Sequence, residues 1–223
     1  MTDKKTARIA GLWYLANILL CVFAIMYVDE KLSVAGDAAA TIESFRANGV
    51  LFGFGLIAYI AGFVCFVLMV GALCRLFKSV DSRLTRLMMA FTLAGAAIAL
   101  ICKLAQTAAT AIPAIEPQSN TAGTLLAFYT NGGMANEIFY GLWLLPLGLL
   151  ILKSDLIPKV IGILLLVTCI CHLIDFGTFF FAPGVSATVQ PVLYAGEIGE
   201  FVFVLWLLVK GVKTRKQGGE PGG

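Results

Sequence analysis

The feature that most constrains this chain is the recurrence of apolar runs of about 20 residues, separated by short polar connections. A run of that length can cross the hydrocarbon core of a bilayer as a helix. Hydrophobic residues fill 60% of the 223 positions and charged residues only 13%, whereas a soluble domain has about 25% charged residues. The sequence therefore predicts an all-α, polytopic membrane protein folded as one bundle in lipid.

We expect six transmembrane helices in a single domain over residues 9–210. The predicted spans are about 9–28, 49–74, 87–111, 133–152, 158–182 and 187–209. Residues 1–8 are predicted to form a cytoplasmic leader, and residues 211–223 a disordered cytoplasmic tail. The first run is longer than the apolar part of a typical signal peptide, which favours a retained helix.

Glycines and prolines predict where these helices are interrupted. The Asn-Gly-Gly sequence at 131–133 predicts a break before the fourth span, and Pro146 predicts a kink inside it. Pro113 is expected to end the third span. The polar segment 29–47 is expected to lie on the outer surface, with a short amphipathic helix at 41–47.

The basic residues predict the orientation in the membrane. Nearly all of them lie in connections on one side, whereas the opposite connections hold only Lys31 and Arg46. The positive-inside rule then places both termini in the cytoplasm, for a protein of the bacterial cytoplasmic (inner) membrane. The net charge of +3 resides in these connections, so we expect the lipid bilayer and no nucleic acid as a partner.

Polar side chains interrupt the predicted spans and form the candidate site. Counted at ~1.5 Å per residue, most of them lie ~20–25 Å from the nearest cytoplasmic basic residue, which predicts one layer in the outer half of the membrane. Such groups usually face an interior or a water-filled cavity, so spans three to six are expected to surround an acidic cavity that opens outward. The layer residues are Tyr59, Lys103, Glu137, His172, Asp175, Tyr194, Glu197 and Glu200.

Three functions remain open from the residues alone. In a carrier for protons or a small or amphiphilic solute, which needs no cofactor, Glu137, Asp175 and Glu197 would titrate, His172 would be the proton partner and Lys103 a fixed counter-charge. In a metal-dependent intramembrane hydrolase acting on lipid, His172 and these three carboxylates would bind Zn, Mn or Fe, although the single histidine argues against this. In a non-catalytic scaffold the polar groups would only pair, as Lys103 with Glu137 or His172 with Asp175.

Several short sequences carry a resemblance to a known family. They are Arg8-Ile-Ala-Gly-Leu-Trp-Tyr14, Gly36-Asp-Ala-Ala-Ala-Thr-Ile42 followed by Leu51-Phe-Gly53, and Gly141-Leu-Trp-Leu-Leu-Pro-Leu-Gly148 leading into Leu156-Ile-Pro-Lys-Val-Ile-Gly162. Over residues 5–210 the chain resembles a bacterial membrane protein family defined as a domain of unknown function (forty-three eighty-six). The resemblance implies six spans in the bacterial cytoplasmic membrane, and it implies no activity and no catalytic residue.

Overall fold

Helices account for nearly all of the computed structural model, which describes residues 3–115, 120–196 and 198–213, and this part of the chain contains no strand. The helices are α1 (Asp3–Val22), the π-helix η1 (Phe23–Asp29), α2 (Glu30–Leu32), α3 (Ala38–Ala47), α4 (Gly49–Phe77), α5 (Ser82–Ile115), α6 (Thr121–Leu142), α7 (Leu144–Lys153), α8 (Lys159–Phe181), α9 (Pro183–Gly196) and α10 (Ile198–Val209). Six segments are long and apolar enough to cross a membrane: Asp3–Leu32, Gly49–Phe77, Ser82–Ile112, Thr121–Lys153, Lys159–Phe181 and Thr188–Val209. The all-α, six-span architecture is confirmed.

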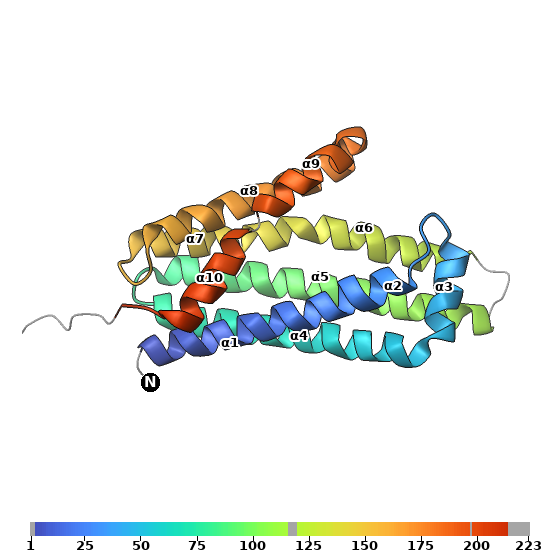
Figure 1. The fold of residues 1–223 in the computed structure, drawn as a ribbon, viewed down its shortest axis with the longest axis horizontal. Coiled ribbons are helices and arrows are strands. Elements are labelled where there is room, and N and C mark those ends of the chain that lie inside the picture. Colours follow the sequence, from blue (N-terminus) through green and yellow to red (C-terminus); the bar gives the residue numbers. More distant parts are fainter. Residues whose placement is uncertain (1–2, 116–119, 197, 214–223) are drawn as a thin grey trace, which may run out of the picture.

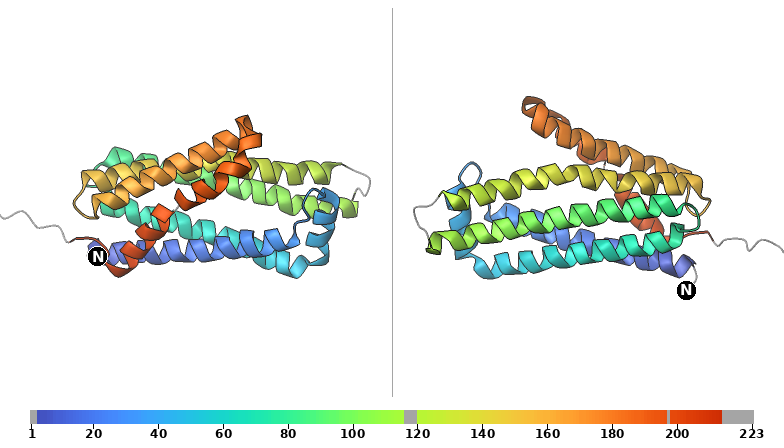
Figure 2. Two further views of the ribbon diagram at one scale, coloured as in Figure 1. Left: turned by 45° about the horizontal axis from the view of Figure 1, so that its top comes forward. Right: turned by 180° about the vertical axis from the view of Figure 1, so that it is seen from behind.

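The spans pack as one bundle with a splayed side. The first four run side by side, and α3 lies across the bundle at the end away from the N-terminus (Figure 1). The α8–α9 hairpin diverges from the others, and α10 returns across α1 (Figures 1 and 2). Large apolar side chains such as Ile57 and Leu205 are more than half exposed on the outside of the bundle, as expected of surfaces that face lipid.

The interior consists of one large apolar cluster, to which the spans contribute large side chains, and a smaller cluster of Val28, Leu32, Phe45 and Phe52. Met69 and Leu73 of α4, Leu147 and Leu150 of α7 and Phe203 of α10 are completely buried. Because lipid tails are as apolar as these side chains, close packing and interhelical polar contacts, more than hydrophobic burial, must select the arrangement of the helices.

Proline, not glycine, interrupts the fourth span. The predicted break at 131–133 is wrong, because α6 continues through these residues. The helix is instead interrupted at Trp143, between α6 and α7, three residues before Pro146. Pro146 has no N–H to donate to the carbonyl of Leu142, and its ring clashes with that carbonyl in a straight helix.

Two other helix boundaries differ in part from the prediction. The third span was expected to end at Pro113; the apolar span does end there, at Ile112, but the helix α5 continues to Ile115. The fixed φ of proline is compatible with a helix, so the helix can continue past it at the cost of a lost hydrogen bond. The short helix expected at 41–47 is confirmed as α3, which begins three residues earlier than expected because the Asp37 side chain accepts the N–H of Ala40 at 2.9 Å and caps the helix. The tail was expected to be disordered from residue 211, and its residues 214–223 lie outside the described part of the chain.

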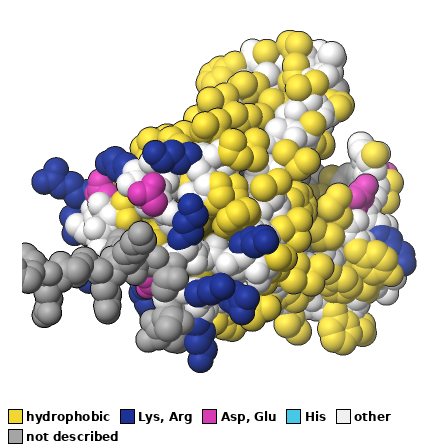
Figure 3. All heavy atoms as spheres, turned by 60° about the vertical axis from the view of Figure 1, so that its left-hand side comes forward, with side chains coloured by type: hydrophobic (Ala, Val, Ile, Leu, Met, Phe, Trp, Pro, Cys, Tyr) yellow, Lys and Arg dark blue, Asp and Glu magenta, His cyan; other side chains and the backbone are white. Residues whose placement is uncertain are grey.

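The end of the bundle that carries the N-terminus is polar and basic. Lys and Arg side chains gather over it, whereas the sides of the molecule are apolar (Figure 3). In the turn after α4, Asp81 accepts the N–H groups of Arg83 and Leu84 at 3.0 and 3.1 Å and the ammonium of Lys153 at 2.8 Å. The hydrogen bond from Lys153 lowers the pKa of Asp81 to about 2, so this carboxylate is ionised at neutral pH and links the α4–α5 turn to the end of α7.

Candidate functional site

Three helices with ionisable side chains approach one another closely because glycines face their neighbours. A Cβ atom at Gly141 of α6 would lie 2.9 Å from the carbonyl oxygen of Cys169 and 3.1 Å from Cβ of His172, both in α8. A Cβ atom at Gly199 of α10 would lie 2.6 Å from Oγ1 of Thr168 in α8. Small residues permit such contacts between membrane helices. They bring the ionisable side chains near these glycines within reach of one another.

Four side chains from four helices then form what we call the His172 network: Tyr14, Glu137, His172 and Glu200. Nδ1 of His172 lies 2.7 Å from Oε2 of Glu137, and Nε2 lies 3.5 Å from Oε1 of Glu200. The hydroxyl of Tyr14 donates to Oε2 of Glu200. The side chains of His172, Glu137 and Glu200 are only 11%, 20% and 22% exposed. An imidazole between two carboxylates can take a proton from one side and deliver one to the other.

A cavity of about 270 Å³ borders this network. Its wall is mostly apolar and aromatic, with the polar groups of the network on one side. The lining residues are Tyr14, Asn17, Ile18, Cys21, Ile25, Phe63, Phe66, Tyr140, Trp143, His172, Glu200 and Phe201. They come from α1, η1, α4, α6, the α6–α7 junction, α8 and α10, so the expectation that spans three to six surround the cavity is wrong for span three. The direction in which a strongly apolar helix faces cannot be read from its composition, because all sides of it are apolar.

One face of the first span supplies much of the cavity wall. Tyr14, Asn17, Cys21 and Ile25 follow one another at three- or four-residue intervals, which places them on one side of a helix. Asn17 donates to the backbone carbonyl of Gly62 in α4 at 3.0 Å, as expected for an interhelical hydrogen bond. This polar stripe through Tyr14 and Asn17 was the available sequence signal that the first span belongs to the site.

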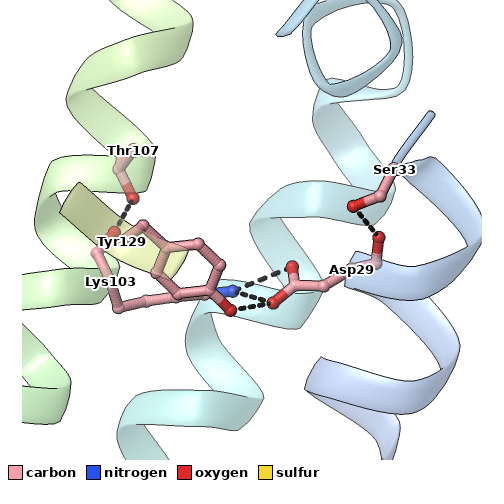
Figure 4. A network of polar contacts seen from close by, with 5 residues as sticks. All are labelled: Asp29, Ser33, Lys103, Thr107 and Tyr129. Atoms are coloured by element: carbon pink, nitrogen blue, oxygen red, sulfur yellow. Dashed lines mark hydrogen bonds and ion pairs between the residues drawn. The ribbon is translucent and has the colours of Figure 1, made fainter. Parts of the chain in front are cut away.

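A second polar cluster, the Lys103 network, surrounds the buried lysine of α5. Lys103 Nζ lies 2.9 and 2.7 Å from the two carboxylate oxygens of Asp29, and the hydroxyl of Tyr129 donates to Oδ2 of Asp29 at 2.7 Å (Figure 4). The ammonium also lies 5.1 Å from the ring centre of Tyr59 and 5.7 Å from that of Phe52. Lys103 and Asp29 are 1% and 6% exposed, so their charges neutralise each other inside the protein.

Asp29 is the partner of Lys103 that sequence reasoning missed. The prediction placed it in a surface segment, since the apolar run stops at Val28. The helix continues instead through η1 and α2 to Leu32. The signal was present, because no glycine or proline follows Gly11 until Gly36.

The predicted polar residues are thus divided between two networks in place of one layer. Tyr59 joins Lys103, whereas Tyr194 is 56% exposed on α9 and does not line the cavity. Asp175 is 8% exposed, and its Oδ1 has no hydrogen-bond partner in the described part of the chain. Glu197 lies outside the described residues. The pairs left open by the sequence, Lys103 with Glu137 and His172 with Asp175, are replaced by Lys103 with Asp29 and His172 with Glu137.

The arrangement around His172 differs from a metal centre. Within residues 3–115, 120–196 and 198–213, no group of three or more His, Cys, Asp or Glu side chains is placed to hold a metal ion. Glu137 and Glu200 approach opposite nitrogens of the same ring, so the two carboxylates and one nitrogen cannot converge on a single ion.

Six apolar helices packed around a partly polar cavity define an integral, multi-pass membrane protein. The chain belongs to the family described as Domain of unknown function (DUF4386), whose model matches residues 9–211. The resemblance seen in the sequence is thereby confirmed. No curated protein and no solved structure matches the chain.

Proposed function

We propose that the protein is a proton-linked carrier for a small amphiphilic solute. The observation that supports it is the His172 network at the wall of the 270 Å³ cavity. Glu200 and His172 border the cavity directly, whereas Glu137 lies behind His172 and is not among the lining residues. A solute bound against Glu200 would therefore compete with the proton shared along the network, which is the requirement for coupling solute movement to proton movement.

The position of the cavity favours a solute that enters from the lipid. Ile25 of η1 and Phe201 of α10 line the cavity and are also 43% and 55% exposed on the surface of the bundle. These two side chains therefore border a lateral opening toward the bilayer. With an apolar wall of aromatic rings and a polar side at Glu200 and His172, the cavity fits an apolar tail with a small polar head.

The head group is expected to be neutral or cationic. If both carboxylates are ionised and the imidazole is protonated, the His172 network carries one net negative charge. A cationic head could replace the imidazolium as the partner of Glu200, whereas an anionic head would be repelled.

We further propose that the end with the N-terminus faces the cytoplasm of a bacterial cell, in the cytoplasmic membrane. The last described residues lie at this same end, since a Cβ atom at Gly211 would be 3.2 Å from Cγ of Lys4. The gathering of Lys and Arg there supports this orientation by the positive-inside rule (Figure 3).

The test is transport in proteoliposomes with an imposed pH gradient. The probe is decyltrimethylammonium, and decyl sulfate is the comparison of opposite charge. We expect accumulation of the cation that depends on the gradient and is lost in Glu200→Gln and His172→Ala. Glu43→Gln is the matched control, because Glu43 lies on α3 and pairs with Arg46 far along the chain from the network. Equal uptake by wild type and Glu200→Gln, or no uptake by wild type, would overturn the proposal.

The two other functions open from the sequence give different results in the same preparation. A metal-dependent lipid hydrolase would hold near-stoichiometric Zn, Mn or Fe that is lost in His172→Ala, and it would release fatty acid from the liposomes. A scaffold would show neither transport nor hydrolysis in the wild type. Elemental analysis of the purified protein therefore belongs beside the transport measurement.

A further inference from the structure

A second pocket, of about 420 Å³, lies between the α2–α3 connection, α5 and α6. It shares no lining residue with the cavity beside His172. Its floor includes Tyr129, which donates to Asp29, so the pocket lies directly over the Lys103 network. Since α3 crosses the bundle at the end away from the N-terminus, this pocket is at the opposite end from the basic surface (Figure 1). We call it the outer pocket.

The hydroxyl groups of the outer pocket are already used as donors within the protein. Ser33 donates to the backbone carbonyl of Asp29 at 2.7 Å, and Thr41 donates to that of Asp37 at 2.8 Å. Tyr129 donates to the Asp29 carboxylate at 2.7 Å. These groups can therefore offer a ligand only the lone pairs of their oxygens.

Two polar side chains of α6 lie on the other side of the pocket and also donate within the protein, although the amide of Asn131 uses only one of its two N–H groups. Thr130 donates to the carbonyl of Leu126 at 3.2 Å, and the amide nitrogen of Asn131 donates to that of Ala127 at 3.0 Å. Both side chains line the pocket and keep an oxygen that can accept.

Gln106 adds an acceptor without a partner to the pocket. Its side chain is 1% exposed and lines the pocket, and its Oε1 has no hydrogen-bond partner in the described part of the chain. A buried amide oxygen without a partner is unfavourable, because it has lost its hydrogen bonds to water. A ligand that donates to Gln106 would remove this cost on binding.

The charge of the outer pocket is negative. Asp29 below it is neutralised by Lys103. Asp37 at its rim uses one carboxylate oxygen to cap α3, and this exposed side chain forms no ion pair with another residue of the described part of the chain. The pocket thus combines one net negative charge with several acceptors.

From this combination we propose that the outer pocket binds a small organic cation with several N–H donors, of the ammonium or guanidinium class. The cation donates to Oε1 of Gln106 and pairs with the carboxylate of Asp37. The binding does not depend on the carrier function, because it uses none of the groups beside His172.

The experiment is a titration of the protein in nanodiscs, followed by ligand-observed NMR, with methylguanidinium as the probe. Two comparison molecules separate charge from donors: tetramethylammonium has the charge without N–H groups, and N-methylurea has N–H groups without the charge. We expect saturable binding of methylguanidinium and at least about tenfold weaker binding of either comparison molecule, since each lacks one of the two interactions.

The variants test the two named contacts. Gln106→Leu and Asp37→Asn should each weaken methylguanidinium binding by about tenfold or more. Asparagine still caps a helix, so Asp37→Asn removes the charge and keeps α3. Glu43→Gln removes the same charge from the same helix outside the pocket and should bind as the wild type does.

Several results would overturn the inference: no saturable binding of methylguanidinium, equal binding by Asp37→Asn, or tetramethylammonium binding as tightly as methylguanidinium. Glu200→Gln separates this site from the carrier, because it should abolish uptake of decyltrimethylammonium and leave methylguanidinium binding unchanged. A loss of methylguanidinium binding in Glu200→Gln would also contradict two independent sites.

Discussion

At the scale of single residues, Lys103 depends strongly on its surroundings, because its buried charge needs an opposite charge beside it. Its ammonium is buried in a span and is matched by the two oxygens of Asp29, with Tyr129 as a further hydrogen-bond donor to that carboxylate. Removing one partner of a buried ion pair leaves the other charge without compensation, whereas removing both leaves only a polar or apolar contact. The pair therefore constrains which single substitutions the bundle tolerates.

Asp29→Asn and Lys103→Met are each expected to lower the free energy of unfolding by about 3–5 kcal/mol. The double variant should recover most of this loss, because no unpaired charge remains in the interior. Unfolding in mixed micelles with increasing SDS measures the three variants against the wild type. Independent, additive losses in the double variant would show that the two charges do not stabilise each other.

The partner of Lys103 could not be predicted from the sequence, although Lys103 itself stood out as a charge in an apolar span. The first span was predicted by its hydropathy, which ends at Val28, whereas the helix is set by backbone continuity and reaches Leu32. The same limit applies to His172: the prediction that it belongs with Glu137 and Glu200 in one site agrees with the contacts, but its Nδ1 lies 2.7 Å from the carboxylate of Glu137, whereas the sequence had also left open a pair with Asp175, three residues away.

At the scale of helices, glycines decide how closely α6, α8 and α10 approach. Gly141 and Gly199 lie against backbone or side-chain atoms of α8, whereas Gly133 of α6 has open space around its Cα. Glycine therefore has opposite effects within one helix. It is required where the backbones meet and only lowers helix propensity where they do not.

Gly141→Ala should destabilise the protein by about 1–3 kcal/mol, because the new methyl group meets the backbone carbonyl of Cys169. Gly133→Ala, on the same helix, should be neutral or stabilising by up to about 1 kcal/mol, since alanine favours the helix and meets no neighbour. Both follow from SDS unfolding curves. A smaller loss for Gly141→Ala than for Gly133→Ala would contradict the close α6–α8 contact.

Helix interruptions illustrate which local signals are reliable in lipid. Pro146 interrupts the fourth span as predicted, because it lacks an N–H and its ring opposes the preceding turn, whereas α5 continues through Pro113 and α9 through Pro191. Asn131, Gly132 and Gly133 do not interrupt the fourth span, although in water this sequence favours a turn. In hydrocarbon the backbone groups of a turn would have no water to bond, so the helix is retained.

At the scale of the whole molecule, the number of spans could be predicted because long apolar runs separated by basic connections leave few alternatives. The cavity could not be assigned to the correct spans. Its position depends on the rotation of each helix about its axis, and a change of one residue rotates a side chain by about 100°. The first span, which was not predicted to line the cavity, does so with Tyr14 and Asn17, whereas the third span, which was predicted to line it, contributes no lining residue in the described part of the chain.

The proposed orientation predicts which positions a membrane-impermeant maleimide can reach in intact cells. After replacement of the six native cysteines, Glu43→Cys on α3 should react from outside the cell. Lys213→Cys, at the end with the basic residues, should react only after the membrane is permeabilised. The reverse pattern would show that the basic end faces outward.

The π-helix η1 gives the first span two anchors with different angular positions. Before η1, Tyr14 forms a hydrogen bond with Glu200, and at the end of η1, Asp29 forms an ion pair with Lys103. A π turn contains one residue more than an α turn, and one residue corresponds to about 100° of rotation. Converting η1 into a regular α-helix would therefore turn one anchor away from its partner while the other held. The seven residues of η1 therefore set the rotation, about the helix axis, between the face that lines the cavity and the face below the outer pocket.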